Sequence, residues 1–160
     1  MIGIADEGMN MDLGELINSR GVIRLETKEK REALEQMIEV LARRREITSK
    51  DKLRRAIKDR EKILSTGIGF GLAVPHAKIP QVKKFCAVIG ISKEGIPFES
   101  MDGKAVNIIV MIAAPDDAHE EYLRILAKIT HTLKNEDTRK GIIETKDSKS
   151  VITLFSKMEY

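Results

Sequence analysis

The stretch RAIKDREKILSTGIGFGLAVPHAKIP (residues 55–80) decides how this chain is interpreted. It joins three glycines within residues 67–71 to a proline–histidine pair, Pro75 and His76. Glycines allow positive φ and a close approach of the backbone to other groups, and free N–H groups in such a turn can bind an anion. Pro75 fixes its own φ and favours an extended Val74. The stretch therefore presents His76 from a stiff backbone, beside groups that suit a charged ligand.

The glycine run does not match the common nucleotide-binding motifs. A dinucleotide fingerprint has the spacing G-x-G-x-x-G between a strand and a helix, whereas this chain has G-x-G-x-G followed by LAVPHAK. The run also lacks the G-K-[ST] ending of a P-loop. We therefore do not expect it to bind the phosphates of a nucleotide.

The composition indicates a soluble globular protein. The chain has 160 residues, 42% of them hydrophobic and 33% charged, which favours one domain with an ordinary core. Its longest apolar run, residues 108–114, is far shorter than the roughly 20 residues of a spanning helix. Asp6 and Glu7 stand where a signal peptide has a basic region, and the single Cys86 excludes an internal disulfide. We expect a cytoplasmic protein without direct membrane insertion.

Positive charge is concentrated in residues 43–60, which contain nine Lys or Arg residues and three acidic residues. One interpretation is the solvated face of a helix, and another is a docking surface for an anionic partner. The formal net charge of +3 is too small to indicate nucleic-acid binding, and no aromatic residue interleaves the basic stretch to stack on bases. We expect no nucleic-acid partner.

The hydrophobic pattern predicts alternating strands and helices. GVIRLE (21–26) is typical of a short strand, and Thr27 is the predicted N-cap of a first helix. Thr48 and Asp51 resemble a capping box that begins a second helix. The apolar face of that helix is predicted at Leu53, Ala56, Ile57 and Leu64.

FCAVIGI (85–91) and VNIIVMIAA (106–114) have strand character. A third helix is predicted after Asp116 or Asp117. Its inner face is predicted to carry Leu123, Leu126, Ile129 and Leu133. Two shorter helices are predicted near 137–144 and 148–158.

Helices on both sides of apolar strands indicate an α/β or α+β sandwich in three layers. Our prediction is the α/β class: a single three-layer α/β/α domain over residues 1–160, with a mixed β-sheet flanked by helices on both faces. The strand order does not follow from the pattern.

REKILSTGIGFGLAVPHAK (60–78) resembles the segment R-E-x-x-x-S-T-G-I-G-x-G-[IVL]-A-[IV]-P-H. That segment marks the type-2 EIIA domain of the bacterial phosphoenolpyruvate:sugar phosphotransferase system, a family with fructose-type, mannitol-type and nitrogen-regulatory members. The resemblance continues in TKEKREALEQMIEVLARRREI before the motif and in IPFESMDGKAVNIIVMIAAP and YLRILAKIT after it. It covers roughly residues 12–156.

The resemblance implies that His76 accepts a phosphoryl group from a histidine phosphocarrier protein and passes it on, to an EIIB component in a sugar-uptake system. The chemistry suits an imidazole, whose pKa near 6.5 leaves most of the ring neutral and nucleophilic at pH 7. Phosphoryl transfer asks the protein mainly for in-line positioning and for donors around three oxygens.

Other positions of the motif are assigned by the same resemblance. Arg60 is expected to hold phosphoryl oxygens, for which a planar guanidinium is well suited. Ser65 and Thr66 are expected to donate hydroxyl or backbone hydrogen bonds to the phosphate or to His76, although these two could also simply form the turn. Gly67 is included among the phosphate-binding residues. A carboxylate beside a phosphate would repel it, so Glu61 is expected to form a structural salt bridge.

The chain departs from the family at a second histidine, which many members have in a segment H-L-x-x-L-A. Aligned with that segment, YLRILA puts Tyr122 in the place of the histidine, and His119 lies three residues earlier. Three alternatives follow: His119 takes the role, Tyr122 donates its hydroxyl, or the role is absent. We include His119 among the candidate catalytic residues and treat His131 as a structural or surface residue.

Two rival interpretations compete with a phosphoryl carrier. A metal site formed by His76, His119 and Asp116 has suitable residue types but no compact motif such as H-E-x-x-H, so we expect neither a metal nor a cofactor. The second rival is a nitrogen-regulatory EIIA that acts mainly as a phosphorylation-dependent binding protein. Cys86 lies in an apolar strand pattern, where a buried structural thiol is expected instead of an EIIB-type nucleophile.

Overall fold

The computed structural model describes residues 13–156. Both ends of the predicted domain, 1–160, lie outside the described residues, as do Asp6, Glu7 and the last two residues of the helix predicted at 148–158. The extent of the domain therefore stays a prediction.

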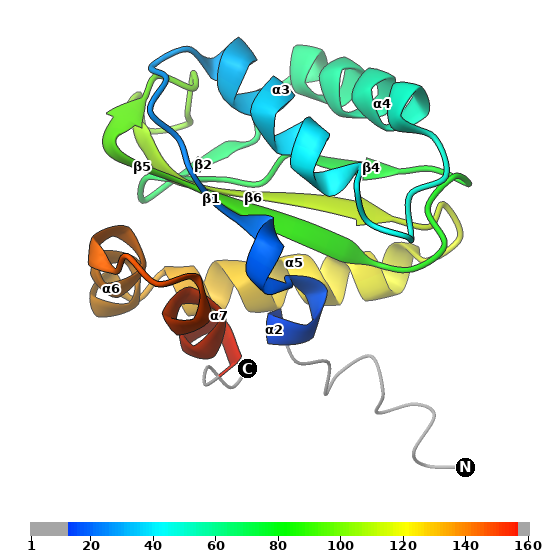
Figure 1. Ribbon diagram of the computed structural model, residues 1–160. Helices are drawn as coiled ribbons and strands as arrows, with labels where there is room; N and C mark the ends of the chain where they lie inside the picture. Colours follow the sequence, from blue (N-terminus) through cyan, green and yellow to red (C-terminus); the bar gives the residue numbers. More distant parts are fainter. Residues whose placement is uncertain (1–12, 157–160) are drawn as a thin grey trace.

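A mixed β-sheet forms the middle layer (Figure 1), and it has six strands within the described chain. They are β1 (Val22–Arg24), β2 (Gly67–Gly69), β3 (Leu72–Ala73), β4 (His76–Lys78), β5 (Cys86–Ile96) and β6 (Val106–Ala114). Their order is β1-β5-β6-β3-β2, and β4 pairs with β6 beyond the end of β3. The pairs β5–β6 and β2–β3 are antiparallel, while β1–β5, β3–β6 and β4–β6 are parallel. The predicted mixed sheet is confirmed.

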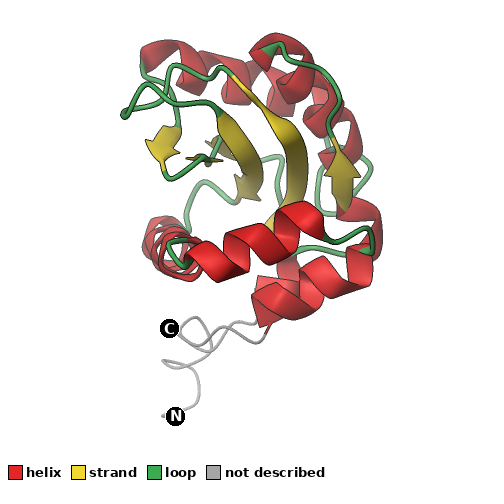
Figure 2. Ribbon diagram, turned by 90° about the vertical axis from the view of Figure 1, so that its left-hand side faces the viewer, coloured by secondary structure: helices red, strands yellow, loops and turns green. Residues whose placement is uncertain are grey.

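Helices cover both faces of the sheet (Figures 1 and 2). On one face lie α3 (Lys30–Leu41) and α4 (Lys50–Ile63). On the other face lie α2 (Leu13–Leu16), α5 (His119–Leu133), α6 (Glu136–Glu144) and α7 (Ser148–Ser156). A short 3-10 turn, η1 (Ser19–Gly21), leads into β1. The predicted three-layer α/β architecture is confirmed.

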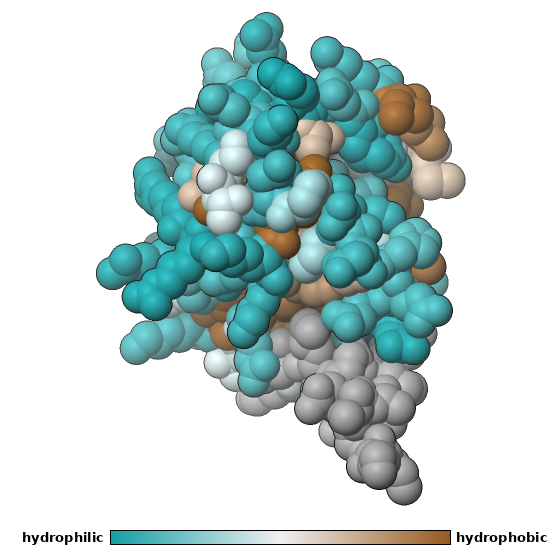
Figure 3. All heavy atoms as spheres, turned by 90° about the vertical axis from the view of Figure 1, so that its right-hand side faces the viewer, coloured by the Kyte–Doolittle hydropathy of each residue, from teal (hydrophilic) through white to brown (hydrophobic). Residues whose placement is uncertain are grey.

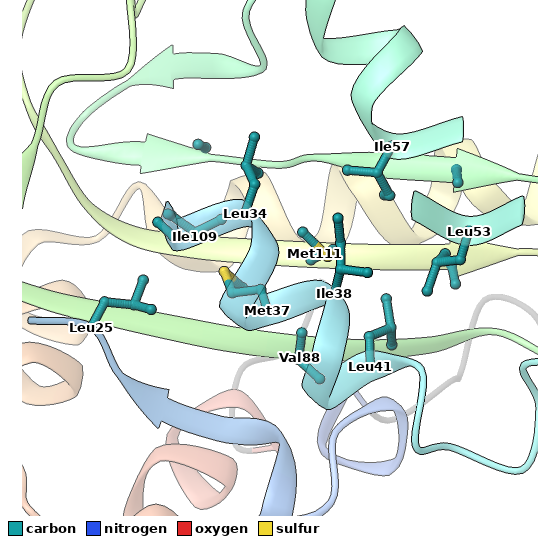
Figure 4. Close-up of a cluster of buried hydrophobic side chains, with 14 of the residues drawn as sticks. Leu25, Leu34, Met37, Ile38, Leu41, Leu53, Ile57, Val88, Ile109 and Met111 are labelled. Atoms are coloured by element: carbon teal, nitrogen blue, oxygen red, sulfur yellow. The ribbon is translucent and has the colours of Figure 1, made fainter. Parts of the chain in front are cut away.

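Two separate hydrophobic clusters hold these layers together, one on each face of the sheet. Figure 4 shows the first, in which side chains of α3 and α4 pack on β5 and β6. The labelled members are Leu25, Leu34, Met37, Ile38, Leu41, Leu53, Ile57, Val88, Ile109 and Met111. Because both faces of β6 and of residues 86–91 of β5 are covered, these segments are almost continuously apolar instead of alternating with polar residues.

Three of the nine basic residues in the stretch 43–60 are paired with acidic residues of α3. Arg54 contacts Glu35 and Glu39 at 3.2 and 3.3 Å, Lys50 pairs with Glu39 and Lys58 with Glu35. The hydrogen bond from Lys58 is the main cause that lowers the pKa of Glu35. These three side chains therefore hold α4 against α3, as the helical-face interpretation expects.

The predicted capping box of the second helix is wrong. The N-cap of α4 is Ser49, whose hydroxyl accepts a hydrogen bond from the Lys52 backbone N–H at 3.2 Å. Thr48 instead donates its hydroxyl to the carbonyl of Gln81 at 3.0 Å. A contact with a distant loop thus shifts the helix start by one residue.

The other two predicted caps are wrong as well. Helix α3 follows Glu29, and the Thr27 hydroxyl accepts a hydrogen bond from the Glu29 backbone N–H before the helix begins. Helix α5 follows Ala118, so neither Asp116 nor Asp117 caps it.

Two leucines that were predicted to be buried are exposed. Leu64 is 67% exposed because α4 ends at Ile63, and the buried face of its last turn carries Glu61 instead. Leu123 is 49% exposed, since α5 turns Tyr122 and Ile125 towards the sheet.

The surface of the molecule is mostly hydrophilic on the side that Figure 3 shows, apart from a limited apolar patch at one edge. Among the described residues, no helix combines the length and apolar character needed to cross a bilayer.

Gly90 of β5 supplies a test of the packing. A Cβ atom at this position would lie 2.7 Å from Leu25 Cδ1 and 2.8 Å from Met37 Sδ, closer than real contacts allow. We expect Gly90→Ala to lower the free energy of unfolding by about 1–3 kcal/mol through overpacking, as measured by urea denaturation. Gly21→Ala is the matched control, because its added Cβ meets no atom closer than 3.4 Å. Equal losses in the two variants would contradict the described packing.

Candidate functional site

Pro75 divides one extended segment into β3 and β4. Proline has no N–H to donate to a strand neighbour, but its carbonyl accepts a hydrogen bond from the Ile112 N–H at 3.0 Å. The pairing with β6 resumes immediately, with His76 opposite Ile112. His76 is therefore held in register by a strand in the middle of the sheet.

Side chains along this segment alternate between the two faces of the sheet, as in any strand. Ala73 and Ala77 belong to the cluster under α3 and α4, whereas Leu72 and Val74 belong to the cluster on the α5 side. His76 follows Val74 on the α5 side, where its ring meets Tyr122 of α5.

One ring nitrogen of His76 is fixed by the backbone. Nδ1 lies 3.0 Å from the carbonyl oxygen of Val74. A carbonyl can only accept, so Nδ1 carries the proton and donates it. The lone pair of the neutral ring is then on Nε2, which is the nitrogen available to attack an electrophile.

His76 is partly buried, and this burial is the main cause that lowers its pKa below the ordinary 6.5. The positive charges of Arg60 and Lys78 lower the pKa further. The hydrogen bond to Val74 and the charge of Glu61 act in the opposite direction. The imidazole is therefore neutral, and nucleophilic, over a wider pH range than a free histidine.

Arg60 lies in the last turn of α4 and donates to the carbonyl of Leu64 at 2.7 Å. This bond spans the end of the helix and holds the guanidinium over the following turn. Its charge acts on both His76 and Tyr122. The structure thus brings together two of the predicted catalytic residues, His76 and Arg60, within electrostatic range.

The third predicted catalytic residue, His119, is connected to His76 by way of Lys78 and Tyr122. Lys78 Nζ lies 2.7 Å from His119 Nδ1, and an ammonium can only donate, so this nitrogen of His119 accepts. The same Nζ lies 4.9 Å from the centre of the Tyr122 ring, a distance typical of a cation–π contact. Tyr122 in turn lies 4.9 Å from His76, ring centre to ring centre. His119, Lys78, Tyr122 and His76 therefore form one chain of contacts.

The predicted phosphate-binding residues Ser65, Thr66 and Gly67 are part of a hydrogen-bonded turn. The Ser65 hydroxyl donates to the carbonyl of Phe98 and accepts from the Gly67 N–H. The buried carboxylate of Glu61 accepts both the N–H and the hydroxyl of Thr66.

Glu61 has the structural role that the sequence suggested. Besides Thr66, its carboxylate contacts Lys30 Nζ at 3.5 Å. It therefore links α3, α4 and the start of the glycine run.

Lys78 was missed in the sequence analysis, although a signal was available. Residues two apart on a strand lie on the same face, so the K of PHAK had to point to the same side as His76 once that segment was assigned to a strand.

Cys86 is fully buried, and burial raises the pKa of its thiol to about 12. The expectation of a buried structural thiol is confirmed. Within residues 13–156, no group of three or more His, Cys, Asp or Glu side chains could hold a metal ion.

Comparison with known proteins assigns the chain to a family. The family model described as "Phosphoenolpyruvate-dependent sugar phosphotransferase system, EIIA 2" matches residues 15–158. The chain belongs to this family. The resemblance noted in the sequence is thereby confirmed.

One relative of this EIIA domain is the fructose-specific EIIABC component of the phosphotransferase system of Bacillus subtilis. The two are 32% identical over 148 residues, which is 92% of this chain but only 23% of the relative.

Two solved structures share its fold. The nitrogen regulatory protein IIA-Ntr of Neisseria meningitidis has a TM-score of 0.84 and 25% identity, over 89% of this chain and 98% of that one. Enzyme IIAMTL of Escherichia coli was solved in a complex with phosphorylated enzyme IIBMTL. It has a TM-score of 0.77 and 21% identity, over 89% of this chain and 98% of that one.

The electrostatics of this EIIA domain give a direct test. Because the charge of Arg60 lowers the pKa of His76, we expect Arg60→Gln to move that pKa upwards, towards 6.5. An NMR titration of the His76 ring protons measures it, with wild type showing a midpoint below 6.5. The exposed Arg55 on the same helix supplies the control variant Arg55→Gln. A midpoint that Arg60→Gln leaves in place would contradict the proximity of the guanidinium to the ring.

Proposed function

We propose that the protein is a phosphoryl carrier in which Nε2 of His76 accepts a phosphoryl group from a histidine phosphocarrier protein and passes it to an EIIB component. The observation that carries the proposal is the Nδ1–H bond to Val74, which leaves Nε2 as the nucleophile of a ring on which the charges of Arg60 and Lys78 act. Family membership supports the phosphotransferase context. The EIIB partner is supported by the complex in which the similar enzyme IIAMTL was solved.

The proposed step conserves atoms and charge without a separate base. A bond forms between Nε2 and phosphorus while the bond from phosphorus to the donor nitrogen breaks, and the donor ring leaves with that electron pair. The Nδ1 proton stays on His76, held by the Val74 carbonyl. The phosphorylated ring is therefore cationic and leaves as a neutral imidazole in the next transfer, which suits a relay.

Cationic side chains near His76 compensate the charge that arrives. A phosphoryl group brings close to two negative charges at pH 7, and Arg60 and Lys78 are the positive charges that act on the ring. Arg60 is proposed to contact phosphoryl oxygens directly. Removing one donor from an oxyanion hole slows acyl transfer at least about 100-fold, and a loss of roughly that size is expected for Arg60.

The roles of the remaining predicted residues are proposed from their contacts. His119 holds Lys78 in place. Ser65, Thr66 and Gly67 maintain the turn, because the two hydroxyls and the N–H groups of Thr66 and Gly67 already donate within it. The proposal places the protein in the cytoplasm, with no cofactor and no nucleic-acid partner.

Labelling with phosphoenolpyruvate tests the proposal. In the presence of the general phosphotransferase enzyme and its phosphocarrier, wild type should gain acid-labile, base-stable label, and His76→Ala should gain none. His131→Ala is the control for the loss of an exposed histidine on α5. Label in His76→Ala, or none in wild type with any cognate donor, would rule out the carrier function.

The second candidate is a regulatory binding protein of the nitrogen-regulatory type. It is supported by the similarity to IIA-Ntr, whose TM-score of 0.84 exceeds the 0.77 of enzyme IIAMTL at the same coverage. Transfer of label from phosphorylated protein to an EIIB component would support sugar uptake. Label that stays on His76, together with a binding partner that distinguishes the phosphorylated from the unphosphorylated form, would support regulation.

A further inference from the structure

Tyr122 carries a buried polar group without a partner. Its side chain is only 4% exposed, and its hydroxyl has no hydrogen-bond partner among the described residues. Leaving a buried hydroxyl unpaired is unfavourable, and each such group in a native protein calls for an explanation. Packing alone does not explain the hydroxyl, because phenylalanine would fill the same space without the unpaired oxygen.

The surroundings of Tyr122 explain why a hydroxyl is useful there. Its ring contacts the imidazole of His76 at 4.9 Å, with 41° between the planes. Lys78 Nζ lies over the ring at 4.9 Å, and the charge of Arg60 reaches the phenol as well as the imidazole. The unpaired oxygen thus belongs to a side chain that contacts the proposed phosphoryl acceptor and Lys78 and that lies within electrostatic range of Arg60.

The protonation state of Tyr122 suits a donor. Burial raises the pKa of the phenol to about 12, although Arg60 acts against that shift. The hydroxyl is therefore protonated at any pH near neutrality, so it can donate to an anion and does not repel one.

His119 is less suited to the same task. It is exposed, and its Nδ1 already accepts the hydrogen bond of Lys78. This contact instead holds the ammonium against the Tyr122 ring, which limits the orientations of both side chains.

We propose that the Tyr122 hydroxyl is a hydrogen-bond donor to the phosphoryl group on His76, and that it finds its partner only when His76 is phosphorylated. This inference rests on the proposed carrier function. Because the bond exists only in the phosphorylated protein, it stabilises that form selectively and prolongs its lifetime before transfer or hydrolysis.

The test compares wild type with Tyr122→Phe, which keeps the ring and removes only the hydroxyl. Both proteins are labelled from phosphoenolpyruvate, and the loss of label and the ³¹P resonance of the phosphohistidine are measured. We expect Tyr122→Phe to take label on His76 but to lose it about tenfold faster, as for a hydrogen bond to a charged group, with a shifted ³¹P resonance.

Thr132→Val is the matched control. Thr132 lies ten residues further along α5, about 15 Å away, and its hydroxyl is likewise buried and unpaired. This variant should keep the lifetime and resonance of wild type. Unphosphorylated Tyr122→Phe should be at least as stable as wild type to thermal unfolding, because an unpaired polar atom is removed.

Tyr122→His is the second variant, since it restores an N–H donor at the same position. Its label should last longer than that of Tyr122→Phe, and equal lifetimes in the two variants would overturn the assignment of a donor. A wild-type lifetime and resonance in Tyr122→Phe would refute the tyrosine inference alone. Absence of label in wild type would refute the carrier function, and this inference with it.

Discussion

The pairing of β4 with β6 is the constraint on which the site depends. His76 of β4 pairs with Ile112 of β6. Strand β6 is hydrogen-bonded along both edges and buried on both faces. A short edge strand alone would not keep a side chain in a fixed position. Because β4 is hydrogen-bonded to β6, the imidazole of His76 has a defined direction. The Val74 carbonyl then accepts the Nδ1 proton, which leaves the lone pair on Nε2.

The carboxylate of Glu61 is the second feature that stabilises the site. It is buried, and it makes hydrogen bonds and an ion pair there. It accepts from Thr66 and contacts Lys30, so the desolvation cost of burying a charge is offset by bonds to charged and backbone donors. A carboxylate would repel a phosphate, and these contacts show the structural role that the sequence analysis expected for it. Its position explains why R-E occurs as a pair: the arginine faces the site, while the adjacent glutamate ties the helix to the glycine run.

The sequence predicted those features that depend on local pattern. Strand β6 has the predicted limits, 106–114, because a long apolar run between polar residues permits little else. Strand β5 was predicted only to residue 91, whereas it continues to Ile96 through polar residues that are bonded to Asn107. The start of α4 was misplaced because a tertiary contact engages Thr48, which bonds to Gln81 instead of to its own helix. At α3 the cause is local, since Thr27 bonds to Glu29 before the helix begins. At the candidate site, the motif predicted His76 and Arg60, which the structure places within electrostatic range of each other. The link from Lys78 to His119 joins residues 41 positions apart and follows from no local pattern.

The sealed position of Cys86 has a practical consequence. The chain has a single thiol, and burial within β5, together with its high pKa, keeps it from forming the thiolate that reacts with alkylating reagents. A cysteine introduced on the surface would then be the one reactive thiol of the folded molecule. A fluorophore or spin label can accordingly be attached at a chosen surface position without first replacing Cys86. Distances from that label to a bound partner protein can then be measured while the core keeps its native residues.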